Sequence, residues 1–137
     1  MKRKTVTAVA PATSEEAAKH FSRKLAFETD CWDVHYSLTS RLDEMVVLDV
    51  RSPELFEAGH VAGAVNLPHV RISKDALAAY PEDQLFVVYC AGPHCNGADK
   101  AALRLARLGR PVKLMIGGVT GWLDEGFDLT QSEAAVG

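Results

Sequence analysis

The amino-acid sequence predicts an α/β fold in which a parallel sheet is covered by helices on both faces. Residues 44–50 and 84–90 are dominated by apolar side chains, as is typical of parallel strands buried on both sides. Segments with helical spacing lie between the strand-like runs, and this alternation favours a parallel sheet. The 137 residues are expected to form a single domain, with a core over about residues 28–128 and a frayed tail over residues 129–137.

Two helices are predicted before the first strand. Thr13, with Glu16 three positions later, forms a capping box that starts a helix over about residues 14–26. Residues 31–40 place apolar side chains four positions apart and predict a second, short helix.

Short elements alternate in the middle of the chain. After the first strand, Pro53 starts a short helix and Gly59 ends it. A second, shorter strand is predicted over residues 64–68. Ser73 is expected to be the N-cap of a connecting helix over residues 72–80.

The C-terminal half contains the most apolar strand and the clearest helix. That strand ends in Cys90, and Asn96 starts a helix that Gly109 ends. One more strand is predicted over residues 111–118, followed by a last short helix over residues 119–126.

Charge and composition narrow the possible functions. The net charge of −3 is spread along the sequence, so neither a nucleic-acid partner nor a membrane surface is expected. The basic start MKRK is followed by TVTAVA, which is too short for a signal-peptide core, so a soluble cytoplasmic protein is expected. Three cysteines, an odd number in a chain of ordinary size, favour thiol chemistry over a disulfide framework.

Cys90 is the candidate catalytic residue, because ligands of open α/β sheets bind beyond the carboxyl ends of the strands. The loop over residues 91–96 leads into a helix, whose dipole and free N–H groups lower the pKa of a nearby thiol and hold anions. Gly92 permits a close backbone approach, and Asn96 with Asp99 is expected to form a capping pair. The alternative is that this cysteine is a small buried hydrophobe at a strand end.

Three motifs in a fixed order resemble the rhodanese family over about residues 45–127. The first, in VVLDVRSPELFEAGHVAGAVNLP, matches a signature of that family through Asp49, Arg51, Glu57, Gly59, His60, Gly63, Ala64, Asn66 and Pro68. The second is VVYC, which ends in Cys90 before a turn and a helix. The third, MIGGVTGW, matches through Gly117, Gly118 and Trp122.

The resemblance implies a rhodanese-like three-layer fold, with a central parallel sheet of about five strands, and Cys90 as the catalytic cysteine of a sulfurtransferase. In such enzymes the thiolate takes a sulfane sulfur from a small anion such as thiosulfate, or from a persulfide. The resulting persulfide passes it to cyanide or to a thiol, including a thiol of a protein partner. No metal or organic cofactor is required. The persulfide charge is expected to be held by backbone amides of the active-site loop. The residues that supply these amides or line the loop are Ala91, Gly92, Pro93, His94, Cys95 and Asn96.

The loop departs from the family at two positions. Many rhodaneses carry an Arg or Lys here, whereas this loop has only His94, which either supplies a charge or hydrogen bond or is a solvated residue. This departure puts thiosulfate in doubt as the donor. Cys95 either resolves the persulfide on Cys90 by forming a disulfide or, as we expect, only lines the loop. Cys31 is expected to have no role in transfer.

The resemblance places Asp49 and Arg51 near the base of the loop as candidate supporting residues, where Arg51 would add positive charge. A structural ion pair is the alternative. Phosphatases of this architecture need a Cys-x5-Arg loop, and Asn96 in the Arg position disfavours that activity. A metal site is not expected, because paired ligands with regular spacing are missing. A non-catalytic binding or persulfide-carrier module remains an alternative, since the loop lacks charge.

Overall fold

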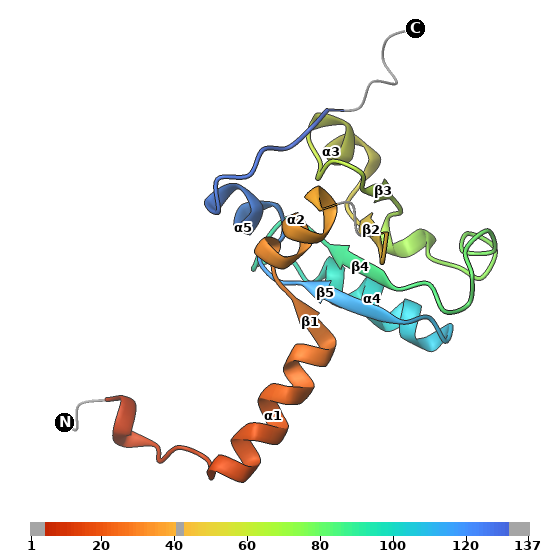
Figure 1. The fold of residues 1–137 in the computed structure, drawn as a ribbon. Helices are drawn as coiled ribbons and strands as arrows, with labels where there is room; N and C mark the ends of the chain where they lie inside the picture. Colours follow the sequence, from red (N-terminus) through yellow and green to blue (C-terminus); the bar gives the residue numbers. More distant parts are fainter. Residues whose placement is uncertain (1–4, 41–42, 132–137) are drawn as a thin grey trace, which may run out of the picture.

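The computed structural model describes residues 5–40 and 43–131 and centres on a five-stranded parallel sheet (Figure 1). The strands follow one another across the sheet in the order β1-β5-β4-β2-β3. Their bounds are Glu28–Thr29 (β1), Val46–Asp49 (β2), Val65–Asn66 (β3), Phe86–Tyr89 (β4) and Val112–Met115 (β5). The predicted α/β fold with about five parallel strands is confirmed.

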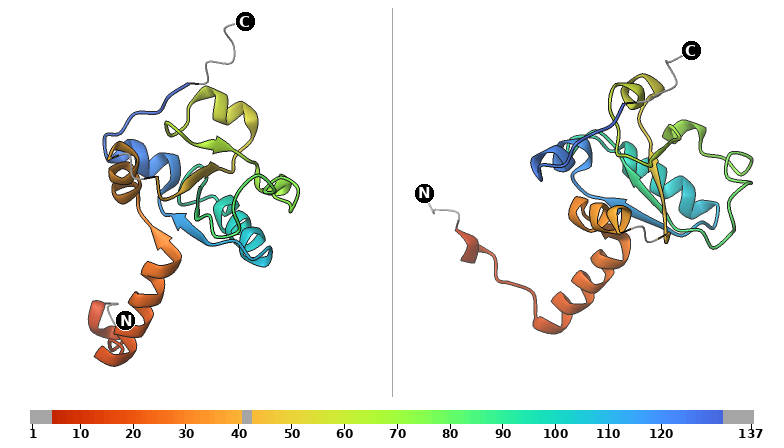
Figure 2. Two further views of the ribbon diagram at one scale, coloured as in Figure 1. Left: turned by 45° about the vertical axis from the view of Figure 1, so that its right-hand side comes forward. Right: turned by 45° about the horizontal axis from the view of Figure 1, so that its top comes forward.

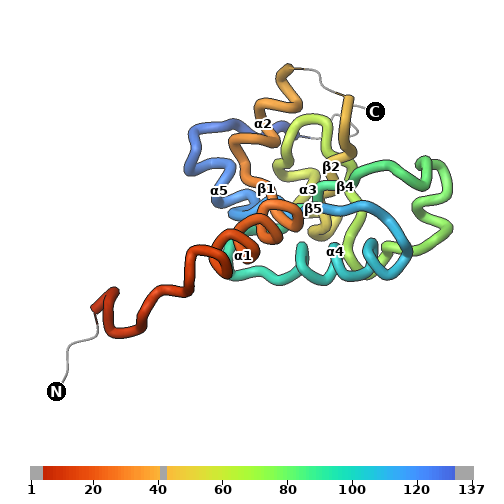
Figure 3. The backbone as a smooth tube through the Cα atoms, turned by 60° about the horizontal axis from the view of Figure 1, so that its bottom comes forward, coloured from red at the N-terminus to blue at the C-terminus, as the bar shows by residue number. Residues whose placement is uncertain are grey.

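Helices cover both faces of this sheet and make three layers. Figure 3 shows α4 on one side of the sheet and α2 and α5 on the other. The bounds of the helices in the described residues are Val6–Ala8 (η1), Ser14–Phe27 (α1), Cys31–Thr39 (α2), Pro53–Ala58 (α3), His69–Arg71 (η2), Gly97–Arg107 (α4) and Gly118–Asp124 (α5), where η denotes a 3-10 helix.

Side chains along β4 alternate between the two faces of the sheet. Phe86, Val88 and Cys90 belong to the core cluster that packs against α4. Val87 and Tyr89 belong to the cluster that packs against α2 and α5. Because both faces are buried, the strand has no polar alternation, and the side chain of Cys90 lies on the α4 side.

The sheet contains one strand that the sequence did not predict. β1 pairs with β5 at the edge of the sheet, with Glu28 opposite Leu114. It has only two residues and follows α1 directly, so neither a turn residue nor an apolar pattern marks it. Its consequence is that Glu28 is placed beside the C-terminal half of β5.

The helix predicted over residues 72–80 is wrong, because turns occupy this segment. The hydroxyl of Ser73 does accept a hydrogen bond from the N–H of Ala76 (3.1 Å), as an N-cap would. The guanidinium of Arg110, however, takes up the backbone oxygens that follow, with donor-to-acceptor distances of 2.6–3.2 Å to Leu77, Tyr80 and Pro81. The backbone hydrogen bonds of this segment mostly span three residues, as from the N–H of Ala78 to Asp75 and from the N–H of Tyr80 to Leu77, so turns form in place of a continuous α-helix.

The N-terminal helix α1 extends away from the sheet, whereas the last described residues are bonded to the rest of the fold. α1 projects away from the sheet (Figure 2), and none of its residues, all of which the structure describes, is buried. Its predicted cap is confirmed, since Thr13 accepts a hydrogen bond from the N–H of Glu16. Thr130 exchanges two backbone hydrogen bonds of 2.8 Å with His60, so the prediction that the chain frays from residue 129 is wrong there. The rest of that predicted tail, residues 132–137, lies outside the described residues.

Candidate active site

Cys90 lies at the carboxyl end of β4, where the chain turns toward α4 (Figure 1). This is the edge of a parallel sheet at which ligands bind. The residue is 7% exposed and lines a cavity of about 260 Å³ between its own loop and the turn from β5 into α5. One side of Cys90 therefore packs in the core, and the other opens onto the cavity.

Two glycines allow the start of α5 to approach this loop closely. Gly117 and Gly118 have φ angles of +90° and +57°, which side-chain-bearing residues rarely adopt. A Cβ at Gly118 would clash with the carbonyl oxygen of Cys90 and lie 2.8 Å from the amide nitrogen of Gly92. The pair of glycines is therefore required by backbone contact between the β5–α5 turn and the loop.

The first turn of α5 also fixes the loop by hydrogen bonds. The N–H of Val119 donates to the carbonyl oxygen of Cys90 at 3.1 Å. The N–H and the hydroxyl of Thr120 both donate to the carbonyl oxygen of Ala91, at 3.0 and 3.2 Å. A Cβ at Gly92 would lie 2.6 Å from the Thr120 hydroxyl oxygen. Thr120 is thus a site residue that the sequence analysis missed, and its position two residues after the glycine pair is the only signal for it.

The loop backbone has N–H groups without hydrogen-bond acceptors. The N–H of Cys95 donates to the carbonyl oxygen of Gly92 at 3.1 Å and closes a tight turn, and Pro93 has no N–H. Four N–H groups of the loop have no acceptor among the residues that the structure describes: those of Ala91, Gly92, His94 and Asn96. Clustered N–H groups of this kind can hold an anion.

Asn96 is the N-cap of α4, as predicted, but its side chain makes no capping hydrogen bond. Its φ and ψ of −95° and 15° differ from the extended geometry that lets a cap side chain reach the helix, so the predicted pairing with Asp99 is wrong. The N–H of Gly97 instead donates to the sulfur of Cys95 at 3.4 Å. The N-terminus of α4 is therefore directed at a sulfur atom.

Cys90 and Cys95 are joined by a disulfide, with their Cα atoms 6.5 Å apart. Cys95 thus lines the cavity beside Cys90, and its sulfur is in addition bonded to the sulfur of Cys90. A Cβ at Gly97 would lie 2.8 Å from the Cys90 sulfur and 3.4 Å from the Cys95 sulfur. Because Gly97 has no side chain, there is space for the two sulfur atoms to come into contact.

The cavity beside Cys90 has acidic and no basic side chains among the described residues that line it. Its two carboxylates belong to Glu28 and Asp99. Glu28 is partly neutralised by Lys24 at 3.0 Å, whereas Asp99 has no ion-pair partner in the described part of the chain. His94 is exposed and does not line the cavity. The sequence analysis missed Glu28, because it lies in the unpredicted strand β1.

Asp49 and Arg51 form a buried ion pair on the other face of the sheet. The guanidinium of Arg51 lies 2.7 Å from the Asp49 carboxylate and also donates to the carbonyl oxygen of Gly59. The hydroxyl of Tyr89 donates to the same carboxylate at 2.7 Å. Burial, and next the charge of Asp49, raise the pKa of Tyr89 and keep this donor protonated. Neither charged residue lines the cavity beside Cys90, so the structural ion pair is the role that the geometry supports.

Cys31 lies beneath the glycine turn of α5 and is separate from the cavity of Cys90. Its thiol is placed to donate to the carbonyl oxygens of Ile116 and Gly118, at 3.5 and 3.7 Å. Burial, and then the charges of Asp30 and Glu125, raise the pKa of Cys31 to about 11. The thiol is therefore neutral near pH 7 and unsuited to nucleophilic attack.

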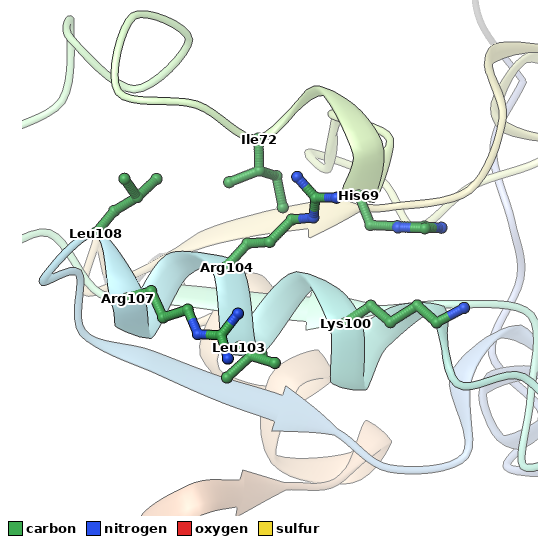
Figure 4. Close-up of a pocket in the computed structure, with 7 residues that line it drawn as sticks. All are labelled: His69, Ile72, Lys100, Leu103, Arg104, Arg107 and Leu108. Atoms are coloured by element: carbon green, nitrogen blue, oxygen red, sulfur yellow. The ribbon is translucent and has the colours of Figure 1, made fainter.

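The fold has a second, larger cavity of about 650 Å³ between α4 and η2 (Figure 4). It is lined by His69, Ile72, Lys100, Leu103, Arg104, Arg107 and Leu108. In Figure 4, Arg104 extends from α4 toward η2. No residue of the active-site loop lines this cavity, so it is separate from the cavity beside Cys90.

Within the described residues, no cluster of three or more His, Cys, Asp or Glu side chains is placed to bind a metal ion. None of the helices in the described ranges is long and apolar enough to span a membrane.

Comparison with known proteins identifies the fold. The chain matches the model of the Rhodanese-like domain over residues 35–125. The crystal structure of the BH2092 protein from Bacillus halodurans is 34% identical, with a TM-score of 0.84 and 87% of both chains covered. The thiosulfate sulfurtransferase of Pseudomonas aeruginosa shares the fold, with a TM-score of 0.63 and 22% identity over 86% of this chain and 22% of that one.

One curated relative is a longer protein of a different description. The HTH-type transcriptional regulator Rv0324 of Mycobacterium tuberculosis (strain ATCC 25618 / H37Rv) is 40% identical over 80 residues, which are 58% of this chain. Those residues cover 34% of the regulator, so the chain spans about a third of that relative. The family match extends over most of the described fold and includes the cysteine at the end of its central strand, and the chain therefore belongs to the rhodanese-like domain family.

Proposed function

We propose that this protein is a sulfurtransferase that moves a sulfane sulfur from a donor to a thiol or cyanide acceptor through a persulfide on Cys90. The observation that supports this most directly is the combination of Cys90 at the mouth of a cavity with four loop N–H groups that have no acceptor in the described residues. Such donors stabilise a sulfur anion as an oxyanion hole stabilises an oxyanion. Membership of the rhodanese-like family supports the same chemistry.

Transfer proceeds in two displacements on sulfur. The thiolate of Cys90 attacks the sulfane sulfur of the donor, the bond between that sulfur and the donor breaks, and the donor leaves as a thiolate, or as sulfite in the case of thiosulfate. The acceptor thiolate or cyanide then attacks the outer sulfur of the Cys90 persulfide and releases Cys90 as a thiolate. The disulfide form of the loop must be reduced before the first step, because only a free thiolate is a nucleophile.

The charge of the cavity favours a persulfide donor over thiosulfate. Thiosulfate is a dianion, and the lining offers it the carboxylate of Asp99 and, among the described residues, no basic side chain. Repulsion between like charges disfavours binding of this dianion. A low-molecular-weight or protein persulfide carries less charge, so we assign the donor to the class of persulfides. A cytoplasmic location, where such thiols are kept reduced, is part of this proposal.

A non-catalytic role is the second candidate, and the lack of cations at the cavity favours it. In that role the domain binds a partner, or carries a persulfide without passing it on. The regulator relative, in which a similar segment makes up a third of a transcriptional regulator, fits such a module.

Turnover with a thiol reductant present distinguishes the two candidates. Sulfide or thiocyanate formation is measured with thiosulfate, mercaptopyruvate and cysteine persulfide as donors, for the native protein and for Cys90→Ser. We expect turnover with the persulfide, weak turnover with thiosulfate, and loss of all activity in Cys90→Ser. Native protein that is inert toward every donor supports the binding module, and activity retained by Cys90→Ser means that another sulfur is the nucleophile.

A further inference from the structure

The disulfide between Cys90 and Cys95 shows that these two side chains can react with each other within the loop. Both residues line the same cavity, and their Cα atoms are 6.5 Å apart, inside the limit of about 7 Å for a disulfide. The turn that the Cys95 N–H makes with the carbonyl oxygen of Gly92 brings Cys95 back toward Cys90. The loop therefore places a second thiol beside the persulfide that the proposed function requires on Cys90.

We propose that Cys95 is a resolving cysteine that turns the Cys90 persulfide into a disulfide and releases the sulfane sulfur as hydrosulfide. This inference rests on the proposed function, because it requires a persulfide on Cys90. The Cys95 thiolate attacks the inner sulfur of the persulfide, which is Sγ of Cys90. The bond between that Sγ and the outer sulfur breaks, and the outer sulfur leaves with the bonding electrons and its proton as HS⁻.

The electrons balance without an external oxidant. The sulfane sulfur gains two electrons and becomes sulfide, and the two cysteine thiols lose two electrons and become the disulfide. A dithiol reductant then restores the enzyme by thiol–disulfide exchange and is itself left as a disulfide. The overall reaction is reduction of a sulfane sulfur to sulfide at the expense of a dithiol.

The surroundings of Cys95 favour its thiolate. The N–H of Gly97, the first residue of the eleven-residue helix α4, donates to the Cys95 sulfur at 3.4 Å. A thiol at a helix N-terminus has a lowered pKa, because the helix dipole stabilises the thiolate. Cys95 is also more exposed than Cys90, so the reductant attacks Cys95 and leaves Cys90 as the free thiolate.

The third cysteine provides a contrast. Cys31 is buried, has a raised pKa and does not line the cavity, so it has neither the access nor the ionisation that a resolving cysteine needs. Cys31→Ser is therefore the matched control, since it removes one cysteine and leaves the pair of Cys90 and Cys95 intact.

A single-turnover experiment tests the proposal. Reduced, desalted native protein, Cys95→Ser, Cys90→Ser and Cys31→Ser are mixed with one equivalent of cysteine persulfide and no reductant. Sulfide release and intact mass are then measured, with Cys90→Ser as the background. We expect the native protein and Cys31→Ser to release one sulfide per chain and to end two hydrogens lighter than the reduced chain. Cys95→Ser is expected to release none and to gain the mass of one sulfur atom.

The outcomes separate this inference from the proposed function. If the native protein keeps the extra sulfur, or if Cys95→Ser releases sulfide at the native rate, the resolving role is overturned while the sulfurtransferase proposal stands. If Cys95→Ser gains no sulfur although its unfolding midpoint is native, the proposed function itself fails. Gly97→Ala provides a second variant that retains both thiols, and its Cβ would lie 2.8 Å from the Cys90 sulfur. It is expected to gain sulfur but to release sulfide at least about tenfold more slowly, because the two sulfurs are misplaced.

Discussion

Replacing Gly118 by Ala tests whether the β5–α5 turn holds the active-site loop in place. Two costs add at this position. The φ of +57° costs an alanine about 1–2 kcal/mol. Overpacking costs about 1–3 kcal/mol more, because the new Cβ meets the backbone of Cys90 and Gly92, which cannot swing aside as a side chain can. We therefore expect Gly118→Ala to lower the free energy of unfolding by about 2–5 kcal/mol.

Gly126→Ala is the matched control for this experiment. Gly126 has a φ of +86°, and a Cβ there would have no atom within 4 Å, so this variant carries backbone strain without a clash. We expect it to lose only about 1–2 kcal/mol in urea unfolding and to keep its sulfur-transfer rate.

Activity gives the second measurement on the same pair of variants. To restore an ordinary contact of 3.4 Å from 2.8 Å, the amide nitrogen of Gly92 must move by about 0.6 Å. Displacing the loop amides from the sulfur is expected to slow transfer by Gly118→Ala about tenfold or more, measured well below its unfolding temperature. Equal losses of stability and rate in the two variants would refute the close approach between the turn and the loop.

Two further predictions concern charge. Folding raises the pKa of Cys31 from 9.0 to about 11. The neutral thiol therefore stabilises the folded state in full below about pH 9, and this stabilisation is lost as the pH rises through about 11. We expect the free energy of unfolding, measured in urea, to fall more between pH 8 and pH 11 in the native protein than in Cys31→Ala, by up to about 3 kcal/mol. Equal losses in the two proteins would contradict the raised pKa. Asp99→Asn should raise kcat/KM for thiosulfate by about two- to fivefold at low salt, with a smaller gain at high salt, because an exposed carboxylate repels the dianion only weakly. An unchanged value at low salt would show that this carboxylate does not act on the donor.

The sequence predicted the position of Cys90 in the candidate site, because this cysteine ends a strand with a clear apolar pattern. The apolar run before Cys90 marked β4, and the rule that sites lie at the carboxyl ends of parallel strands placed the cysteine correctly. The role of Asp49 depended on the strand register, which only the structure supplies. Asp49 is opposite Tyr89 in the sheet, and Cys90 is the next residue after Tyr89, so Cys90 lies on the other face.

The remaining differences arise from contacts between distant segments. The turns that replace the helix predicted over residues 72–80 are held by the guanidinium of Arg110, and no local pattern in that segment indicates a partner some thirty residues away. Glu28 reaches the cavity through a strand of two residues, which is too short to leave a periodic signal. The meeting of Cys90 and Cys95 depends on the turn at Gly92 and on the space at Gly97, and both are properties of the folded loop.

The ring that the loop disulfide closes is very small. Its cysteines are five positions apart, so the bond restricts the unfolded chain little. Chain-entropy arguments give about 2 kcal/mol for such a ring, compared with about 5 kcal/mol for a ring of a hundred residues. We therefore expect the sheet and its helices to keep the same architecture whether the bond is open or closed. In the proposed reaction, a crosslink of this span forms and breaks in every cycle with little effect on the stability of the fold.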